Sequence, residues 1–322
     1  MVDKQKTIDK SVTVSGTGLH TGQLGQITMH SAPENHGIKF RRVDIESKPI
    51  IDADINLVVS TDRGTTLSKN GYSLYTIEHL LAAFMGLGVD NVMIDVDMEE
   101  IPIKDGSSIH FINAIKEAGI VEQKANRKYI EITEPISYII PDKNIEMLIE
   151  PAEKFSATVT IDFEAEILGK QIATLDDINK FESEIAPCRT FVFLHELEFL
   201  LKNNLIKGGD LNNAIVFINR AISQEELDNL AELFNKPKVK VKPNGILNNL
   251  DMHFSNEPAR HKLLDVIGDL ALLGKPLKGK ITASRPGHKA NTEFGQKIFN
   301  ELNKTLMLKK PPFDIYAEPY YD

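Results

Sequence analysis

Three polar residues lie at helical spacing in a segment that is otherwise apolar. His261, Asp265 and Asp269 are four residues apart within EPARHKLLDVIGDLALLG. At 3.6 residues per turn they share one face of a helix expected over residues 257–273. A histidine and a carboxylate one turn apart are the pair that helical zinc sites commonly use. The alternative is a solvated helix face with an ordinary His–Asp pair.

A catalytic zinc site needs a third protein ligand, and distant residues often supply it. His79 lies in TIEHLLAAFMGLG, in the first turns of another expected helix, and is the candidate. Its neighbour Glu78 would then lie beside the metal, where a carboxylate can accept a proton from water. The alternative is a carboxylate that favours the start of a helix, next to a core histidine.

His288 lies in the loop Arg285-Pro286-Gly287-His288-Lys289, after the last expected strand. A protonated imidazole there could donate a proton to a leaving amine, and Asp269 could orient that ring. The alternative is an exposed loop histidine.

The elements that must position these residues follow an order that occurs twice. Strand patterns come first, then the helix with His79, a buried strand, VDNVMIDVDM, and a second helix, SIHFINAIKEAGI. After residue 129, strand patterns are followed by the helix with His261, the strand KGKITAS and a final helix. If the two halves pack face to face, the two histidines could meet at their interface.

The composition limits the classes of function. Lys+Arg 37 against Asp+Glu 46 gives a net charge of −9, which opposes broad nucleic-acid binding. No apolar run is long enough for a transmembrane segment, and MVDKQKTIDK lacks the apolar core of a secretory signal. Cys188 is the single cysteine, in keeping with a reducing compartment. We therefore expect a cytoplasmic protein with no nucleic-acid partner.

Six segments in order resemble the UDP-3-O-acyl-N-acetylglucosamine deacetylase (LpxC) family, which commits carbon to lipid A synthesis. They are SGTGLHTG at 15–22, TIEHLLAAFMGLGVDN at 76–91, IPIKDGSS at 101–108, RTF at 189–191, RHKLLDVIGDL at 260–270 and GHKANT at 287–292. The resemblance implies one catalytic Zn²⁺ held by His79, His261 and Asp265, with Glu78 as general base.

Further roles also come from this resemblance. It makes His288 the general acid, Asp269 its partner and Thr190 a stabiliser of the oxyanion. The residues expected at the substrate are Lys262 near the polar head, Phe163 stacking on nucleotide or sugar, and Leu19, Phe191, Leu197 and Leu200 along an acyl passage. Arg285 departs from the family, which often carries Lys-Ser-Gly-His at this point, but it would keep a positive charge for the diphosphate with a different geometry. The alternative for Phe191, Leu197 and Leu200 is ordinary core packing.

The implied fold is α+β, with two similar two-layer sandwich domains, the active site at their interface and one insert in each. We divide the chain into residues 1–122 with a strand-rich insert near 40–72, a linker at 123–128, residues 129–308 with the acyl-passage insert near 189–220, and a tail at 309–322. In some relatives a dehydratase domain follows the deacetylase, so a fused dehydratase is a candidate partner of the native chain. We expect a monomer.

The sequence thus predicts a zinc-dependent deacetylase that releases acetate from a UDP-linked, 3-O-acylated N-acetylglucosamine. Two alternatives stay open: a zinc amidohydrolase acting on another N-acylated sugar, and a nucleotide-sugar binding protein without turnover.

Overall fold

Two five-stranded sheets with the same strand order form the frame of the protein. The computed structural model describes residues 3–203, 205–234, 238–243, 245–248 and 250–308, so the predicted tail at 309–322 lies outside the described residues. The first sheet runs in the order β2 (Val12–Thr17), β3 (Leu24–Ser31), β9 (Val92–Val96), β4 (Ile38–Arg42) and β5 (Ile50–Asp52). The second runs in the order β12 (Ile136–Ile140), β13 (Ile145–Glu150), β19 (Lys280–Ser284), β14 (Ser156–Asp162) and β15 (Lys170–Leu175).

The pairing directions also repeat. In each sheet the central strand, β9 or β19, is antiparallel to one neighbour and parallel to the other. The strands alternate between inward and outward side chains, as in β14, where Ala157, Val159 and Ile161 are buried. The predicted duplication of the fold is confirmed.

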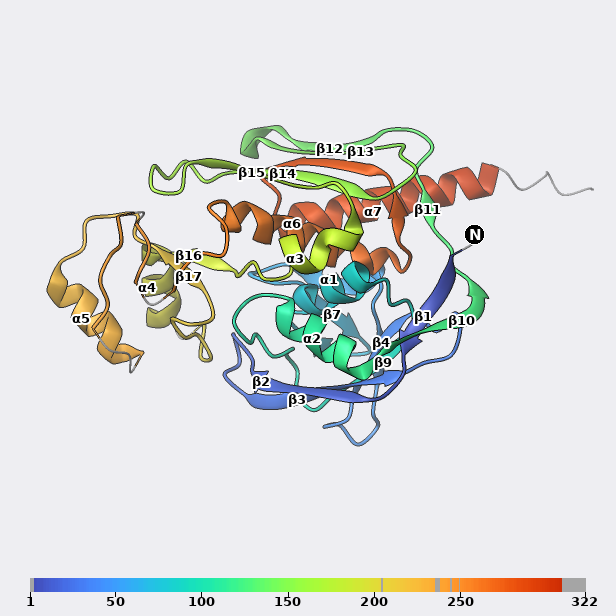
Figure 1. Cartoon of the computed structure of the whole chain (residues 1–322), viewed down its shortest axis with the longest axis horizontal. Coiled ribbons are helices and arrows are strands. Elements are labelled where there is room, and N and C mark those ends of the chain that lie inside the picture. The colour runs from blue at the N-terminus through green and yellow to red at the C-terminus, as the bar shows by residue number, and fades with distance from the viewer. Residues whose placement is uncertain (1–2, 204, 235–237, 244, 249, 309–322) are drawn as a thin grey trace, which may run out of the picture.

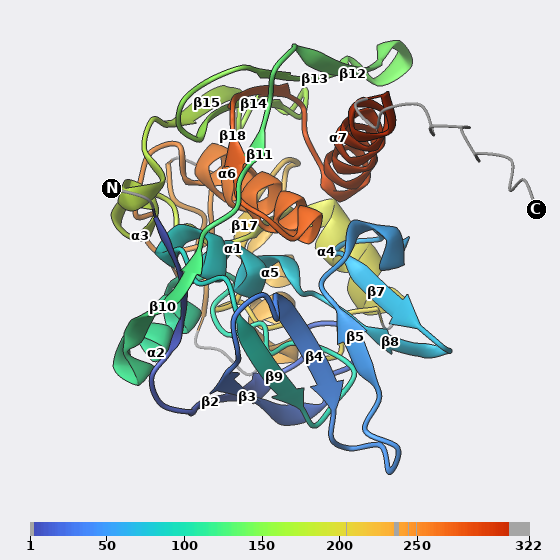
Figure 2. The ribbon, with the colours of Figure 1, turned by 90° about the vertical axis from the view of Figure 1, so that its right-hand side faces the viewer.

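The helices lie between the two sheets (Figure 1). They are α1 (Glu78–Leu87) and α2 (Ile109–Ala118) from the first half, and α6 (Glu257–Leu270) and α7 (His288–Leu308) from the second. Figure 2 shows α1 and α6 at the centre, with one sheet above and the other below. The predicted α+β class with two sheet-and-helix layers is confirmed.

The segment predicted as a linker is a strand. Residues 123–126 belong to β10 (Ile120–Asn126), which pairs antiparallel with β1 (Lys4–Ile8). Its polar sequence fits because Gln123 donates to the carbonyl of Ala32 at 2.9 Å and accepts from Asn91 at 2.7 Å. Beyond it, β11 (Ile130–Glu131) pairs with β18 (Leu277–Lys278) of the second half. The division into 1–122 and 129–308 stays a prediction.

Both inserts differ from the predicted segments. In the first half, β4 and β5 belong to the main sheet, and the extra sheet comprises β6 (Val58–Ser60), β7 (Thr66–Lys69) and β8 (Tyr72–Leu74). In the second half the insert extends past residue 220 and projects from the body (Figure 1). This half adds α3 (Phe181–Glu184), β16 (Phe191–Phe193), α4 (Leu194–Lys202), β17 (Ile215–Phe217) and α5 (Gln224–Leu233).

Short 3-10 helices complete the described elements, at Ile55–Leu57, Pro141–Lys143, Ile178–Lys180 and Ala271–Leu273. None of the helices in the described part of the chain is both long and apolar enough to cross a membrane.

Candidate metal centre and active site

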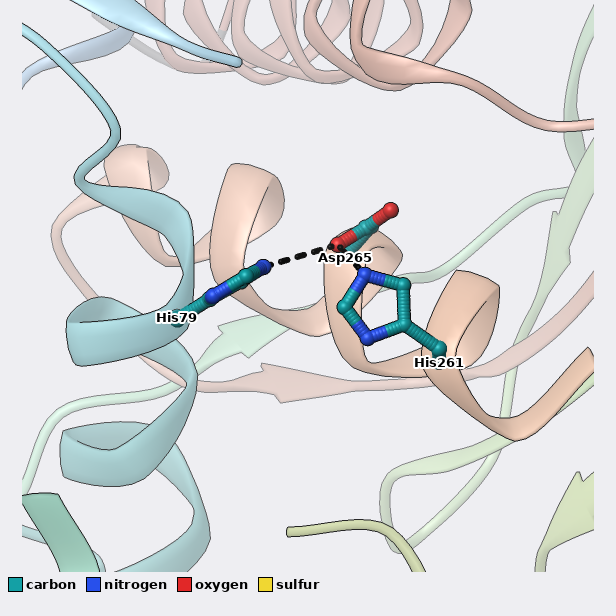
Figure 3. Close-up of side chains that lie close together, drawn as sticks. All are labelled: His79, His261 and Asp265. Atoms are coloured by element: carbon teal, nitrogen blue, oxygen red, sulfur yellow. Dashed lines mark ion pairs between the residues drawn. The ribbon is translucent and has the colours of Figure 1, made fainter. Parts of the chain in front are cut away.

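Three buried side chains from two helices converge on one point (Figure 3). His79 comes from α1, whereas His261 and Asp265 come from successive turns of α6, and their ligand atoms all lie within 4.8 Å of one another. Asp265 Oδ1 is 3.3 Å from His261 Nε2 and 3.7 Å from His79 Nε2. Each residue is at most 5% exposed, which excludes the solvated-face alternative for this helix.

The donor set fits a divalent metal. Asp265 Oδ1 is buried and has no hydrogen-bond partner, although it faces both imidazoles. A buried carboxylate oxygen without a partner is costly, and a cation would satisfy it. Two imidazole nitrogens and one carboxylate oxygen are a ligand set of catalytic zinc sites.

The neighbours of His261 fix the orientation of its ring. Nδ1 lies 3.1 Å from the carbonyl oxygen of Cys188, which can only accept, so this nitrogen carries the proton. Nε2 is left with a free lone pair toward Asp265. Burial lowers the pKa of His261 to about 3, so the ring is neutral and able to ligate a metal. Burial also raises the pKa of the Cys188 thiol, which makes that group unreactive.

A buried ion pair holds the segment that carries the Cys188 carbonyl. Arg189 donates its Nε to Glu257 Oε1 at 2.9 Å, and its backbone N–H to the same oxygen at 3.0 Å. Glu257 is the first residue of α6, so this pair joins the segment to the helix that supplies His261 and Asp265.

The close crossing of α1 and α6 depends on a glycine. A Cβ atom on Gly268 would lie 2.1 Å from the backbone oxygen of Glu78, which no real contact permits. The absent side chain lets α6 approach the start of α1, where Glu78 and His79 lie. Ser108 supports the same turn, because its hydroxyl donates to the carbonyl of His79 at 2.7 Å.

Glu78 lies beside the ligand set, and one of its carboxylate oxygens faces His288. Its Oε2 accepts the backbone N–H of Thr65 at 3.1 Å, and its Oε1 lies 3.8 Å from His288 Nε2. Burial raises the pKa of Glu78, while the nearby His288 opposes this rise. A carboxylate with a raised pKa, next to the candidate metal ligands, has the properties of a general base.

His288 is the first residue of α7 rather than part of the preceding loop, and it is mostly buried. Its Nδ1 donates to Asp269 Oδ2 at 3.0 Å. Burial alone would lower the pKa of His288, but the carboxylates of Asp269, Asp265 and Glu78 outweigh it and raise the pKa to about 9. The ring is therefore protonated at neutral pH, as a general acid must be, and the exposed-loop alternative is wrong.

Asp269 is fully buried and binds three donors. Besides His288, Asn291 donates to Oδ2 at 2.8 Å and the hydroxyl of Thr65 donates to Oδ1 at 2.5 Å. The sequence did not single out Thr65 or Asn291. Thr65 follows the Asp-Arg-Gly turn at 62–64, which was the only local signal near it.

Lys262, Thr190 and His288 contribute polar lining to a cavity of about 660 Å³. Lys262 Nζ is 2.8 Å from Asp265 Oδ2. Burial alone would lower the pKa of Lys262, but Asp265 outweighs it and raises that pKa. The backbone N–H of Thr190 donates to the carbonyl of Gly106 at 2.9 Å.

Apolar side chains also line this cavity. Four residues predicted for the acyl passage contribute to its lining, namely Leu19, Phe191, Leu197 and Leu200. Most of the lining comes from the second insert, and Leu197 also packs in that insert's own core.

Two predicted substrate residues lie outside this cavity. Phe163 is 43% exposed and lines a neighbouring cavity, with its ring 5.4 Å from that of Phe191. Arg285 pairs with Glu164 at 2.8 Å and Asp162 at 3.2 Å, and lines a smaller, separate cavity. These two carboxylates are the partners of Arg285 in the structure, and its contact with a diphosphate stays a prediction. Arg63, which the sequence did not single out, lines the main cavity.

The repeated sandwich, with a His-His-Asp ligand set, a carboxylate and a protonated imidazole at its centre, has the parts of a metal-dependent hydrolase. A sequence profile of the LpxC family, described as UDP-3-O-acyl N-acetylglycosamine deacetylase, matches residues 5–239 and 235–300. The chain belongs to this family and is a deacetylase, as the sequence motifs predicted.

Several relatives cover nearly the whole chain. The bifunctional enzyme LpxC/FabZ of Bacteroides thetaiotaomicron is 44% identical over 319 residues, which are 99% of this chain and 69% of the relative. The enzyme of the same name from Porphyromonas gingivalis is 42% identical over 100% of this chain and 69% of its own length. The UDP-3-O-acyl-N-acetylglucosamine deacetylase of Saccharophagus degradans is 39% identical over 90% of this chain and 88% of its own length.

Proposed function

We propose that this chain hydrolyses the N-acetyl group of UDP-3-O-acyl-N-acetylglucosamine in a zinc-dependent reaction. The products are UDP-3-O-acyl-glucosamine and acetate, and the reaction is the committed step of lipid A biosynthesis. The observation that carries this proposal is the convergence of His79, His261 and Asp265 next to His288, which lines a cavity rich in apolar side chains.

Amide hydrolysis needs an activated water, a polarised carbonyl and a proton for the departing amine. Zn²⁺ held by His79, His261 and Asp265 would supply Lewis-acid activation of the water and of the carbonyl. Glu78 accepts the proton from the attacking water, which its position beside the ligand set and its raised pKa support.

His288 donates its Nε2 proton to the sugar nitrogen as the C–N bond breaks. The hydrogen bond from Nδ1 to Asp269 holds the ring in place and stabilises its positive charge before the substrate binds. The hydroxyl of Thr190 would donate to the developing oxyanion, an interaction worth about 3 kcal/mol for one good donor. Its place in the cavity lining supports this role.

The cavity also favours a substrate with an anionic part and an acyl chain. Arg63 and Lys262 place positive charge in its lining, which suits a diphosphate. The apolar lining, with Leu19, Leu197 and Leu200, suits the 3-O-acyl chain. Phe163, exposed beside the cavity, is proposed to stack on the nucleotide or sugar.

The test is to compare acetate release from UDP-3-O-acyl-N-acetylglucosamine and from UDP-N-acetylglucosamine. Each buried methylene contributes about 0.8 kcal/mol, so burial of four would raise kcat/KM by roughly 200-fold. Equal kcat/KM values would reject the acylated substrate and favour an amidohydrolase of another N-acylated sugar. Binding without acetate release by the zinc-loaded protein would favour a nucleotide-sugar binding protein.

We also propose that the chain acts as a monomer in the cytoplasm. Size-exclusion chromatography with light scattering and cell fractionation test these two statements. Because two relatives are bifunctional, we also propose that the native protein carries a dehydratase domain. The molecular mass of the protein made in its own cells tests this proposal.

A further inference from the structure

Thr65 joins the two carboxylates that flank the candidate metal centre. Its backbone N–H donates to Glu78 Oε2 at 3.1 Å, and its hydroxyl donates to Asp269 Oδ1 at 2.5 Å. Among the described residues, Thr65 alone makes a hydrogen bond to the side chains of both, since His288 lies 3.8 Å from Glu78 Oε1. It is fully buried, so water does not compete for either bond.

The first-half insert delivers Thr65 to this position. The chain leaves β6, turns through Arg63 with φ 61° and Gly64, and reaches Thr65 just before β7. A Cβ atom on Gly64 would lie 3.1 Å from Glu78 Oε1, tighter than most real contacts. The glycine therefore lets this turn pass directly beneath the carboxylate.

The hydroxyl of Thr65 determines how Asp269 can face His288. Asp269 has no solvent contact, and its Oδ2 already binds His288 and Asn291. Thr65 is the partner of the remaining oxygen, Oδ1. Without that donor, a buried charged oxygen would lack a partner, and the carboxylate would gain by rotating away from its present orientation.

We propose that Thr65 is a positioning residue that sets the orientation of the general base and of the general acid's partner together. This inference rests on the proposed roles of Glu78 and His288. Through one residue, the insert of the first half fixes Glu78 on α1 and, through Asp269 on α6, the ring of His288 on α7.

Thr65→Val tests the hydroxyl and keeps the size and the backbone N–H. Outer partners of catalytic groups typically contribute about 10- to 100-fold in activity. We expect kcat to fall by about this factor, with KM and zinc content unchanged, and Thr65→Ser to restore most of the rate. Thr66→Val is the matched control, because Thr66 is also buried but makes no side-chain hydrogen bond to Glu78 or Asp269, and its kcat should equal that of the wild type. An unchanged kcat in Thr65→Val, or an equal loss in Thr66→Val, would overturn the proposal.

A second measurement does not depend on turnover. The Nδ1 proton of His288, bonded to Asp269, should give a downfield proton NMR signal that disappears in His288→Ala. We expect Thr65→Val to shift this signal and Thr66→Val to leave it in place. An unmoved signal in Thr65→Val overturns the positioning role, whatever the activity. If the wild type releases no acetate, the proposed function fails, and this signal alone decides how Thr65 acts on Asp269.

Discussion

His261 donates its Nδ1 proton to the carbonyl oxygen of Cys188 at 3.1 Å, and this contact turns Nε2 toward Asp265. The same carbonyl precedes Arg189, which Glu257 clamps to the first turn of α6. A main-chain oxygen at one end of the ring therefore determines what the other end can bind.

Metal content should separate the ligands from the general acid. We expect about one zinc per chain in the wild type, loss of zinc in His79→Ala and His261→Ala, and retention in His288→Ala. The reason is that His79 and His261 face Asp265 Oδ1, whereas Nδ1 of His288 is bonded to Asp269. Elemental analysis of the purified proteins gives the answer. Equal zinc in all three variants would contradict this assignment.

Glu78→Gln should keep the zinc and lose the reaction. The amide has nearly the shape of the carboxylate but cannot accept a proton, and general base catalysis typically contributes about 10²- to 10⁴-fold. We expect kcat to fall within this range while zinc content stays at the wild-type value. Glu117→Gln on the exposed face of α2 is the control for the chemical change. Normal turnover by Glu78→Gln would remove Glu78 from its role.

Gly268→Ala should separate α1 from α6. The new methyl would meet a backbone oxygen at 2.1 Å, and overpacking of this kind costs about 1–3 kcal/mol or more. We expect a lower free energy of unfolding in urea and weaker zinc binding against a chelator. Gly295→Ala on α7 is the matched control, since its closest neighbours are side-chain ends at 3.2 and 3.3 Å. Similar losses in both variants would contradict a special role for the crossing.

Acid should remove a contribution of Asp105 to stability. Burial alone would raise the pKa of Asp105, but hydrogen bonds from His110 and Ser107 hold it down to about 2. Because the folded-state pKa lies below the ordinary 3.8, the contribution is present above about pH 4 and is lost as the pH falls through about 2. Asp105→Asn should therefore be less stable than the wild type at pH 7, and the difference should shrink toward pH 2. Urea unfolding across this range measures it, and a constant difference would contradict the assignment.

The sequence predicted those parts of the site that lie on one element. His261 and Asp265 are one turn apart on a helix, so periodicity alone places them together. The element order predicted the repeated sandwich, because each strand or helix pattern is local. No local pattern joins α1 to α6, so His79 was proposed from the need for a third ligand and from the repeated element order, and the family resemblance then implied the same residue.

The contacts that depend on tertiary structure could not be predicted. Thr65 and Asp269 are 204 positions apart and meet only because the insert folds beneath α1. The ion pairs of Arg285 with Asp162, the last residue of β14, and with Glu164 just beyond it had no signal in the sequence. The strand at residues 123–126 was not predicted either, because its partners lie on β1, more than 110 positions away.

The ligand set takes His79 from one half of the molecule and His261 and Asp265 from the other, so an ion seated there is a non-covalent cross-link between the halves. A ligand that binds only the folded chain adds about 2.7 kcal/mol of stability when its free concentration is 100 times its Kd. The melting temperature of this chain should therefore rise and fall with the free zinc concentration around it. When zinc is scarce, the enzyme would lose resistance to heat and proteolysis along with its activity. The time for which the protein survives in the cell would then depend on the zinc supply.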